Sequence, residues 1–181
     1  MTSIRFETTN KSVESKSLKN EIWSSIRFFG ILILLFLFLK FGFSISTISG
    51  YSMVPTFDDG SLVITNNLIY EPEHGDIVIY TDSNGFNVIK RVIGLPGDQI
   101  LISNGVVYLN NVALEENYTF GSASDMSLQT LPADSYFLIG DHRTPGESFD
   151  SRSPEVGSIH REDIKGEMLL ALNPFILGSG R

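Results

Sequence analysis

The chain has 181 residues, 42% of them hydrophobic, and no cysteine, so it can bury one substantial core but cannot be a thiolate enzyme, a disulfide scaffold or a cysteine-ligated metal protein. Its formal net charge of -8 is unevenly distributed: residues 1–27 hold five basic and three acidic side chains, whereas residues 41–181 hold seven basic and eighteen acidic ones. So acidic a domain excludes nucleic acid as a partner and would be repelled by anionic lipid unless it were tethered.

The first expected element is an apolar helix near the N-terminus. No polar residue occurs from Phe28 to Leu39, and the apolar character extends from Ile26 to Ile48 if Lys40 reaches toward the interface. That length matches the roughly 20 residues that a membrane-spanning helix needs. A core helix is disfavoured because the run is apolar on all sides and no amphipathic partner helix follows it.

Two interpretations of this segment remain. It is either the apolar part of a cleavable signal peptide, with Ser44-Ile45-Ser46 as the cleavage site, or a permanent anchor. We favour the anchor because the preceding tail is long for a bacterial signal peptide, and the lysines of that tail orient the N-terminus toward the cytoplasm. The expected organisation is a cytoplasmic tail at residues 1–25, a transmembrane anchor at 26–48 and an extracytoplasmic domain at 49–181.

After residue 48 the sequence is typical of a β domain. Short β-branched runs are bounded by Gly, Asp, Asn or Pro, and Asn104-Gly105 between two apolar runs predicts a hairpin. Residues 117–132 are rich in Ser, Asp and Thr and predict an exposed loop, within a smaller hairpin and loop extension at 98–133. We expect a mostly β protein, with a partly closed antiparallel domain on one N-terminal helix. The expected strands lie at residues 61–65, 76–80, 87–93, 136–139 and 167–172.

The common hydrolytic motifs are missing from the sequence. It contains no HExxH, no ligand spacing that suggests zinc, no Gly-rich phosphate loop and no G-x-S-x-G elbow, so we expect neither a metal nor a cofactor. The histidines, His74, His142 and His160, are not close to a serine motif in sequence. Because triad members meet in space, this does not exclude a Ser-His-Asp triad, but nothing favours one.

The distribution of lysine points more strongly to a catalytic residue. Residues 41–181 contain only Lys90 and Lys165, and Lys90 lies inside an apolar strand, where period two places it on the same face as Val88 and Val92. At a pKa of about 10.4, roughly one lysine in 2,500 is neutral at pH 7, too few for a base. Burial that lowers the pKa to about 8 costs roughly 3 kcal/mol and would allow Lys90 to accept a proton from a serine. The alternative is an ordinary edge lysine that extends to water.

Ser52 is the serine that this lysine could serve. It lies in Ser52-Met53-Val54-Pro55, shortly after the apolar segment. Serine and proline near glycine also form ordinary turns, so on this pattern alone Ser52 could simply be part of a turn that leaves the membrane.

Four stretches taken together resemble the type I signal peptidases, membrane-bound Ser-Lys proteases that remove leader peptides. The resemblance covers roughly residues 20–172 and implies the fold of that family. The stretches, in the order of the family, are Gly50-Tyr51-Ser52-Met53-Val54-Pro55-Thr56, Gly75-Asp76-Ile77-Val78, Lys90 to Asp98, and Gly140-Asp141-His142-Arg143 with Ser148-Phe149-Asp150-Ser151-Arg152.

The resemblance implies the role of individual residues. Ser52 is the nucleophile, and its backbone N–H contributes to the oxyanion hole; Lys90 is the general base. Ser148 orients Lys90. The vicinity of Met53 and Pro55 binds substrate. The supporting charged residues are Asp150, Arg152, Asp141 and Arg143.

Gly50 offers no side-chain donor to the oxyanion hole, as in relatives of the Gram-positive type. Two features depart from the usual pattern. His142 replaces the usual Asn, and the step from Arg143 to Ser148 is two residues longer, which affects the assignment of Ser148. Lys90, in place of histidine, is typical of the bacterial branch.

The implied function is cleavage of signal peptides from secretory preproteins after small residues of the Ala-x-Ala type. The expected partners are those signal peptides and the lipid bilayer, with no nucleic acid, and we expect a monomer in the cell membrane. The alternatives are a specialised Ser-Lys processing protease, such as a pilin-maturation enzyme, and a catalytically inactive relative that only binds leader peptides.

Overall fold

The structure is a computed structural model that describes residues 3–68 and 70–172. The chain divides into two compact units, Met1–Gly42 and Phe43–Arg181. The first unit is a helix and the second is a β domain, and each is described by itself.

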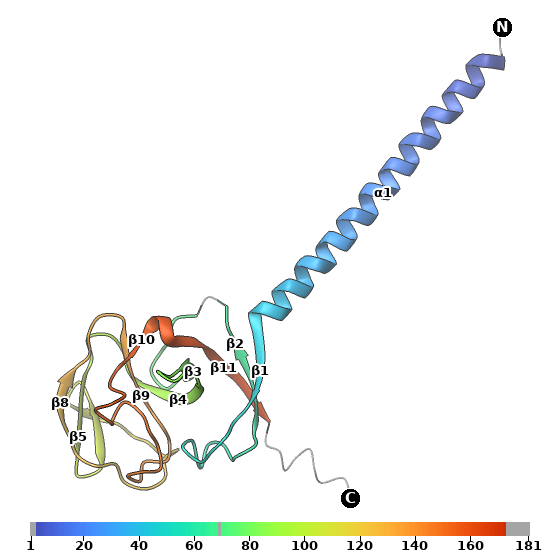
Figure 1. The fold of residues 1–181 in the computed structure, drawn as a ribbon. Helices are drawn as coiled ribbons and strands as arrows, with labels where there is room; N and C mark the ends of the chain where they lie inside the picture. The colour runs from blue at the N-terminus through green and yellow to red at the C-terminus, as the bar shows by residue number, and fades with distance from the viewer. Residues whose placement is uncertain (1–2, 69, 173–181) are drawn as a thin grey trace, which may run out of the picture. The chain divides into compact units, whose positions relative to one another are not determined.

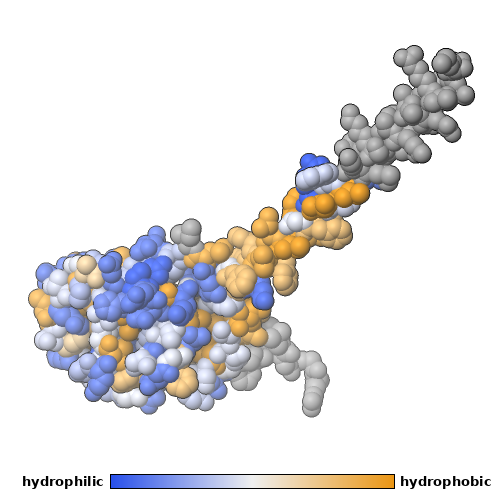
Figure 2. Space-filling model, turned by 45° about the horizontal axis from the view of Figure 1, so that its top comes forward, coloured by the Kyte–Doolittle hydropathy of each residue, from blue (hydrophilic) through white to orange (hydrophobic). Residues whose placement is uncertain are grey.

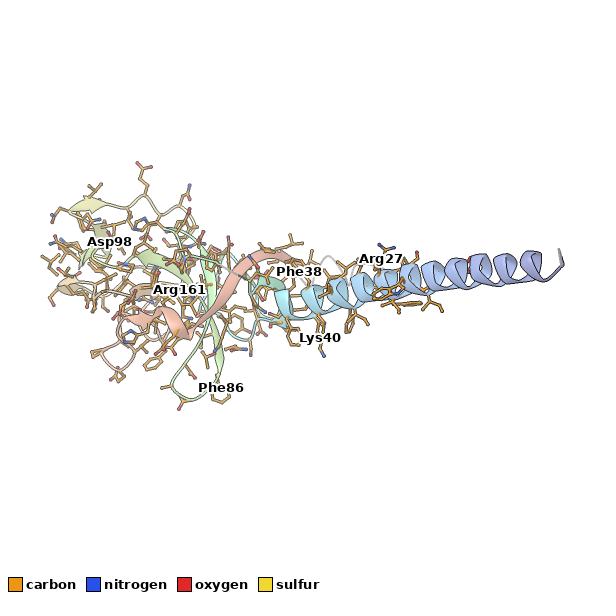
Figure 3. All side chains as sticks on the ribbon, turned by 90° about the horizontal axis from the view of Figure 1, so that it is seen from above. Arg27, Phe38, Lys40, Phe86, Asp98 and Arg161 are labelled. Atoms are coloured by element: carbon orange, nitrogen blue, oxygen red, sulfur yellow. The ribbon has the colours of Figure 1, made fainter. Side chains whose placement is uncertain are left out.

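Helix α1 runs from Ser3 to Gly42. Its part from Glu21 to Gly42 is long and apolar enough to cross a membrane, with a mean hydropathy of 2.3 and no buried side chains in the most apolar window. Figure 2 shows the hydrophobic surface along the coloured part of the helix, and Figure 3 labels Arg27, Phe38 and Lys40 on this part. At 1.5 Å per residue, 22 helical residues span about 33 Å, close to the hydrocarbon thickness of a bilayer.

The helix ends before the position expected from the sequence. Phe43–Thr47, expected to belong to the apolar segment, forms strand β1 and pairs with β2. Ser44 and Ser46 alternate with Ile45, the period-two pattern of a strand, and Ile45 and Thr47 are on the exposed face. The charged side chains of the expected cytoplasmic tail fall mainly within residues 1–20, whose side chains lie outside the described part. The division into tail, anchor and outer domain stays a prediction.

A seven-stranded antiparallel sheet forms the larger part of the β domain (Figure 1). Its order is β1-β2-β11-β3-β4-β9-β10. The long strand β11 pairs with β2 along one part of its length and with β3 along another, which bends the sheet. The remaining bounds are β2 Leu62–Asn66, β3 Ile77–Thr81, β4 Asn87–Gly94, β9 Ser135–Ile139, β10 Ile159–His160 and β11 Ile164–Leu172, with a short 3-10 helix at Arg161–Asp163.

A four-stranded antiparallel sheet, in the order β7-β6-β5-β8, forms the smaller part. Asn104 and Gly105 join β5 to β6 with φ angles of 53° and 77°, the left-handed pair that a two-residue hairpin turn needs. This agrees with the hairpin expected from Asn104-Gly105. The bounds are β5 Gln99–Ser103, β6 Val106–Leu109, β7 Val112–Ala113 and β8 Met126–Thr130.

The five strand regions expected from apolar runs correspond to β2, β3, β4, β9 and β11. The expectation of a loop over residues 117–132 is wrong in part, because β8 lies within it and pairs with β5. Four of the five residues of β8 are exposed, so this edge strand lacks the apolar alternation by which strands are recognised. The mostly β fold class is confirmed.

Strand β4 lies between β3 and β9 and carries the site. All five residues of β9 are buried, and Val92 and Ile93 of β4 pack into the cores on its two sides. At the end of β4, a Cβ on Gly94 would lie 2.7 Å from Leu131 Cδ1 and 2.9 Å from Ile100 Cδ1. The two sheets therefore meet closely at this strand, and that packing fixes the position of the residues along it.

Candidate active site

Lys90 lies in the middle of β4 with only 2% of its surface exposed. Its backbone pairs with Val78, which is fully buried on the neighbouring strand. The side chain reaches Ser52, to whose Oγ the Nζ group donates a hydrogen bond at 2.7 Å. The expectation that Lys90 points toward the core agrees with this burial, and the serine and the lysine are brought together.

Ser52 is held in a turn by its neighbours in the chain. Gly50 enters the turn with a φ of +101°, and its N–H donates to the carboxylate of Asp59 at 2.8 Å. Met53, 1% exposed, anchors the turn in the domain. The carbonyl of Ser52 accepts a hydrogen bond from the backbone N–H of His142 at 3.0 Å. The Ser52 main chain is thus bonded to the segment that follows β9.

The electrostatic environment of Lys90 makes it a usable base. The pKa of Lys90 is lowered to about 8, mainly by burial; the negative charge of Asp150 opposes this shift, the positive charge of Arg152 adds to it, and the charge of Asp141 opposes it. At pH 7 about a tenth of such a lysine is neutral, against roughly 0.03% at an unperturbed pKa. A neutral amine at 2.7 Å can accept the hydroxyl proton of Ser52.

Asp150 organises the loop beside the lysine. It is fully buried and accepts hydrogen bonds from Arg152 Nε at 2.8 Å, Arg152 Nη2 at 2.7 Å, the N–H of Gly140 at 2.9 Å and Ser148 Oγ at 2.5 Å. Burial alone would raise the pKa of Asp150, but the interactions with Arg152 outweigh it and hold the pKa below its ordinary value. The hydroxyl of Ser148, expected to orient Lys90, is here directed to Asp150.

Asp141 and Arg143 belong to a second buried charge network. Asp141, which is fully buried, accepts hydrogen bonds from Arg91 Nε at 2.8 Å and Arg91 Nη2 at 2.7 Å, and a third from the hydroxyl of Thr56. Arg143 donates to both carboxylate oxygens of Glu116, at 2.7 and 2.6 Å. Both networks therefore support the segment that bonds to the Ser52 carbonyl.

The main chain at Gly140 lies very close to the Ser52 turn and to Ser148. A Cβ at this position would collide with the carbonyl oxygen of Ser52 and the hydroxyl of Ser148. The site therefore needs glycine here for close approach of three segments, not for an unusual backbone angle.

Two cavities meet at Ser52. The larger, of about 540 Å³, is lined by Ser52 and Lys90 and by the exposed aromatic side chains of Tyr51 and Phe149. The smaller, of about 180 Å³, has a mixed lining. Its apolar residues are Ile48, Val63, Ile79, Val88 and Ile89, and its polar residues are Ser46, Thr47, Ser49, Ser52 and Asn87.

Met53 and Pro55, whose vicinity was expected to bind substrate, are placed differently from each other. Met53 is buried and Pro55 is exposed. Among the described residues that line the two cavities, neither appears, although their neighbours Ser52 and Tyr51 do. The cavity lining therefore includes the start of the turn but not Met53 or Pro55.

Sequence reasoning missed Arg91, Thr56, Glu116 and Gly140 as supporting residues. Arg91, Thr56 and Gly140 lie inside the stretches that carry the resemblance, so their position was a usable signal. No sequence signal pointed to Glu116, because its ion pair with Arg143 joins residues that only the folded chain brings together. The described residues contain no group of three or more His, Asp or Glu side chains able to hold a metal ion.

Comparisons with known proteins agree with the sequence resemblance. The family described as signal peptidase, peptidase S26, matches residues 22–172. A signal peptidase I of Bacillus amyloliquefaciens is 32% identical, covering 97% of this chain and 96% of that protein. One of Bacillus caldolyticus is 31% identical, covering 75% and 82%. The crystal structure of a signal peptidase I from Enterococcus faecalis V583 is 29% identical and covers 56% of this chain and 99% of that one, with a TM-score of 0.48.

The match over residues 22–172 includes every stretch on which the resemblance was based, and the resemblance is confirmed. The chain therefore belongs to the signal peptidase family, peptidase S26, and is a peptidase that hydrolyses peptide bonds.

Proposed function

We propose that this protein is a membrane-anchored serine endopeptidase that removes N-terminal signal peptides from secreted preproteins with Ser52 and Lys90 as its catalytic pair. The observation that carries the proposal is the 2.7 Å contact between Ser52 Oγ and a lysine that is 2% exposed. Burial of the amine lowers the stability of the protein, but it also lowers the pKa of the amine so that it can act as a base near neutral pH.

The reaction proceeds by acyl transfer. Neutral Lys90 accepts the proton of Ser52 as Oγ attacks the scissile carbonyl, and the Ser52 backbone N–H stabilises the oxyanion. The C–N bond then breaks while Lys90 returns the proton to the leaving amine. Neutral Lys90 next deprotonates a water molecule that attacks the acyl ester. The C–O bond to Ser52 then breaks as Lys90 returns the proton to Oγ, which releases the carboxylic acid product and restores Ser52.

Specificity for small side chains would arise in the smaller cavity. Its walls carry the branched side chains of Ile48, Ile79 and Ile89, and Ser52 lies at its edge. At about 180 Å³ this space suits a short apolar side chain next to the scissile bond better than a long one, in keeping with an Ala-x-Ala site.

The helix would supply the location. Its apolar part, Glu21–Gly42, has the length and composition of a membrane span, and the tail before it carries the excess of basic residues that orients an N-terminus toward the cytoplasm. A monomeric enzyme with its catalytic domain outside would meet preproteins that are still held in the same bilayer. Confinement to one surface raises the effective concentration of substrate.

The test uses the full chain purified in detergent with an Ala-x-Ala peptide substrate. We expect Ser52→Ala and Lys90→Ala each to lose cleavage by at least about a thousandfold, the usual cost of removing a nucleophile or its base. Lys165→Ala is the matched control, because Lys165 is the other lysine of the β domain and is exposed. Circular dichroism checks folding, and substantial activity of a folded Lys90→Ala protein at pH 7 would refute the proposal.

A further inference from the structure

The segment at residues 116–120, which joins β7 to β8, lies against the chain that supports Ser52. The N–H of Phe120 donates to the carbonyl of Asp141 at 3.0 Å, and the N–H of Arg143 donates to the carbonyl of Phe120 at 2.7 Å. Phe120 and His142 form a β-bridge between the two segments. These main-chain contacts hold the segment firmly against the site although it belongs to a different part of the domain.

Tyr118 in this segment covers the ion pair of Arg91 with Asp141. Its ring centroid lies 4.0 Å from Arg91 Cζ, the geometry of a guanidinium stacked on an aromatic face. Its hydroxyl donates to Glu116 Oε1 at 2.9 Å, and Glu116 is itself paired with Arg143. Burial, and then the charge of Glu116, raises the pKa of Tyr118, so the hydroxyl stays protonated and acts as donor.

The covered ion pair connects the strand of the base to the turn of the nucleophile. Arg91 follows Lys90 on β4, and successive strand residues point to opposite faces. Lys90 contacts Ser52 at the start of the turn, whereas Arg91, through Asp141, contacts Thr56 four residues later. Lys90 and Arg91, which are adjacent on β4, therefore contact the turn that carries Ser52 at two points: Lys90 at Ser52, and Arg91 at Thr56 through Asp141.

We propose that Tyr118 is a positioning residue for catalysis: by stacking on Arg91 it keeps the Arg91–Asp141–Thr56 connection in place and thereby holds Ser52 Oγ within reach of Lys90 Nζ. This rests on the proposed catalytic pair. A ring over the ion pair keeps water away from it, so the attraction between the two charges is screened less and water does not compete for their hydrogen bonds. A looser connection would let the turn shift relative to β4, and small displacements of a reacting atom lower the rate steeply.

The alternative is that Tyr118 only stabilises the fold. If so, replacing Tyr118 would lower the fraction of folded, active molecules but would leave the kcat of each active molecule unchanged. The experiment therefore measures kcat for each competent site, with competent sites counted by mass spectrometry after reaction of Ser52 with a serine-acylating inhibitor. Tyr118→Leu removes the aromatic face while keeping apolar volume, and Tyr118→Phe keeps the face while removing the hydroxyl. Tyr108→Leu is the control, since Tyr108 is a half-buried tyrosine of the small sheet.

For Tyr118→Leu we expect kcat per titrated site to fall about tenfold, the size of effect that a partly desolvated cation–π contact can produce. KM should stay within about twofold, because Tyr118 is not among the described residues that line the two cavities at Ser52. Tyr118→Phe should retain most of the rate, and Tyr108→Leu all of it.

Equal kcat per site in Tyr118→Leu and the unmodified chain would overturn the positioning role. If Tyr118→Leu does not fold, Arg91→Lys removes the planar stack from the other side and should give the same loss of kcat per site; an unchanged rate in that variant would equally overturn it. Failure of the proposed function looks different: the unmodified chain would form no adduct on Ser52.

Discussion

Replacing Lys90 with methionine should make the protein more stable at neutral pH while abolishing its activity. Methionine keeps an unbranched chain of similar length in the same space but removes the ammonium group. Lys90 is 2% exposed, and its pKa falls from 10.5 in the unfolded chain to about 8 in the folded one. A difference of that size corresponds to roughly 3 kcal/mol of destabilisation by the charged lysine at pH 7.

The sign of the pH dependence follows from proton binding. Between about pH 8 and pH 10.5 the unfolded chain holds the lysine proton more tightly than the folded chain does, so the free energy of unfolding rises with pH in this window. Below about pH 8 the full cost is present, and above about pH 10.5 it disappears. The advantage of Lys90→Met should therefore be greatest near neutral pH and shrink as the pH rises through this window.

The net gain should be smaller than the full electrostatic cost. The hydrogen bond to Ser52 is lost, and its contribution is about 1 kcal/mol. We therefore expect Lys90→Met to raise the free energy of unfolding by about 2 kcal/mol at pH 7.

The assay is denaturant unfolding of the full chain in detergent, followed by the β-sheet signal in circular dichroism at pH 7, 9 and 10.5. Ser52→Ala serves as the matched control, because it loses the same hydrogen bond but keeps the ammonium. A Lys90→Met protein that is less stable than the Ser52→Ala protein at pH 7, with a difference that does not vary with pH, would show that Lys90 is not a strained cation.

Three further outcomes are expected. The rate kcat/KM should rise with pH along an acid limb centred near pH 8, because only neutral Lys90 is a base; a limb near pH 10 would contradict the lowered pKa. Arg152→Gln removes a positive charge that lowers the pKa of Lys90, so its acid limb should move to higher pH, and a shift to lower pH would contradict the assigned interaction. Gly140→Ala introduces a methyl group against the Ser52 carbonyl and should lower stability by about 1–3 kcal/mol together with activity, measured by denaturation and peptide cleavage; a fully active, equally stable variant would show that the three segments can separate without cost.

Local sequence features predicted the elements whose conformation depends on near neighbours. Asn104-Gly105 predicts its hairpin because both residues must adopt positive φ, which few other pairs tolerate. The buried side of β4 follows from the period of two, which places Lys90 on the same face as Val88 and Val92. Strand β8 was missed because an exposed edge strand is defined by its partner β5 and not by its own composition.

The sequence by itself determined the family, an apolar helix long enough for a membrane, and the two residues of the proposed catalytic pair, since each is encoded in a contiguous stretch. Only the tertiary structure decided which atoms meet. The hydroxyl of Ser148 is directed to its near neighbour Asp150 and not to Lys90. Tyr118 covers Arg91, a residue 27 positions earlier in the chain, and the geometry of that long-range contact depends on how the two sheets pack around β4. The lowered pKa of Lys90 has the same origin, because desolvation is a property of the surroundings that the fold assembles and not of the lysine or its neighbours in the chain.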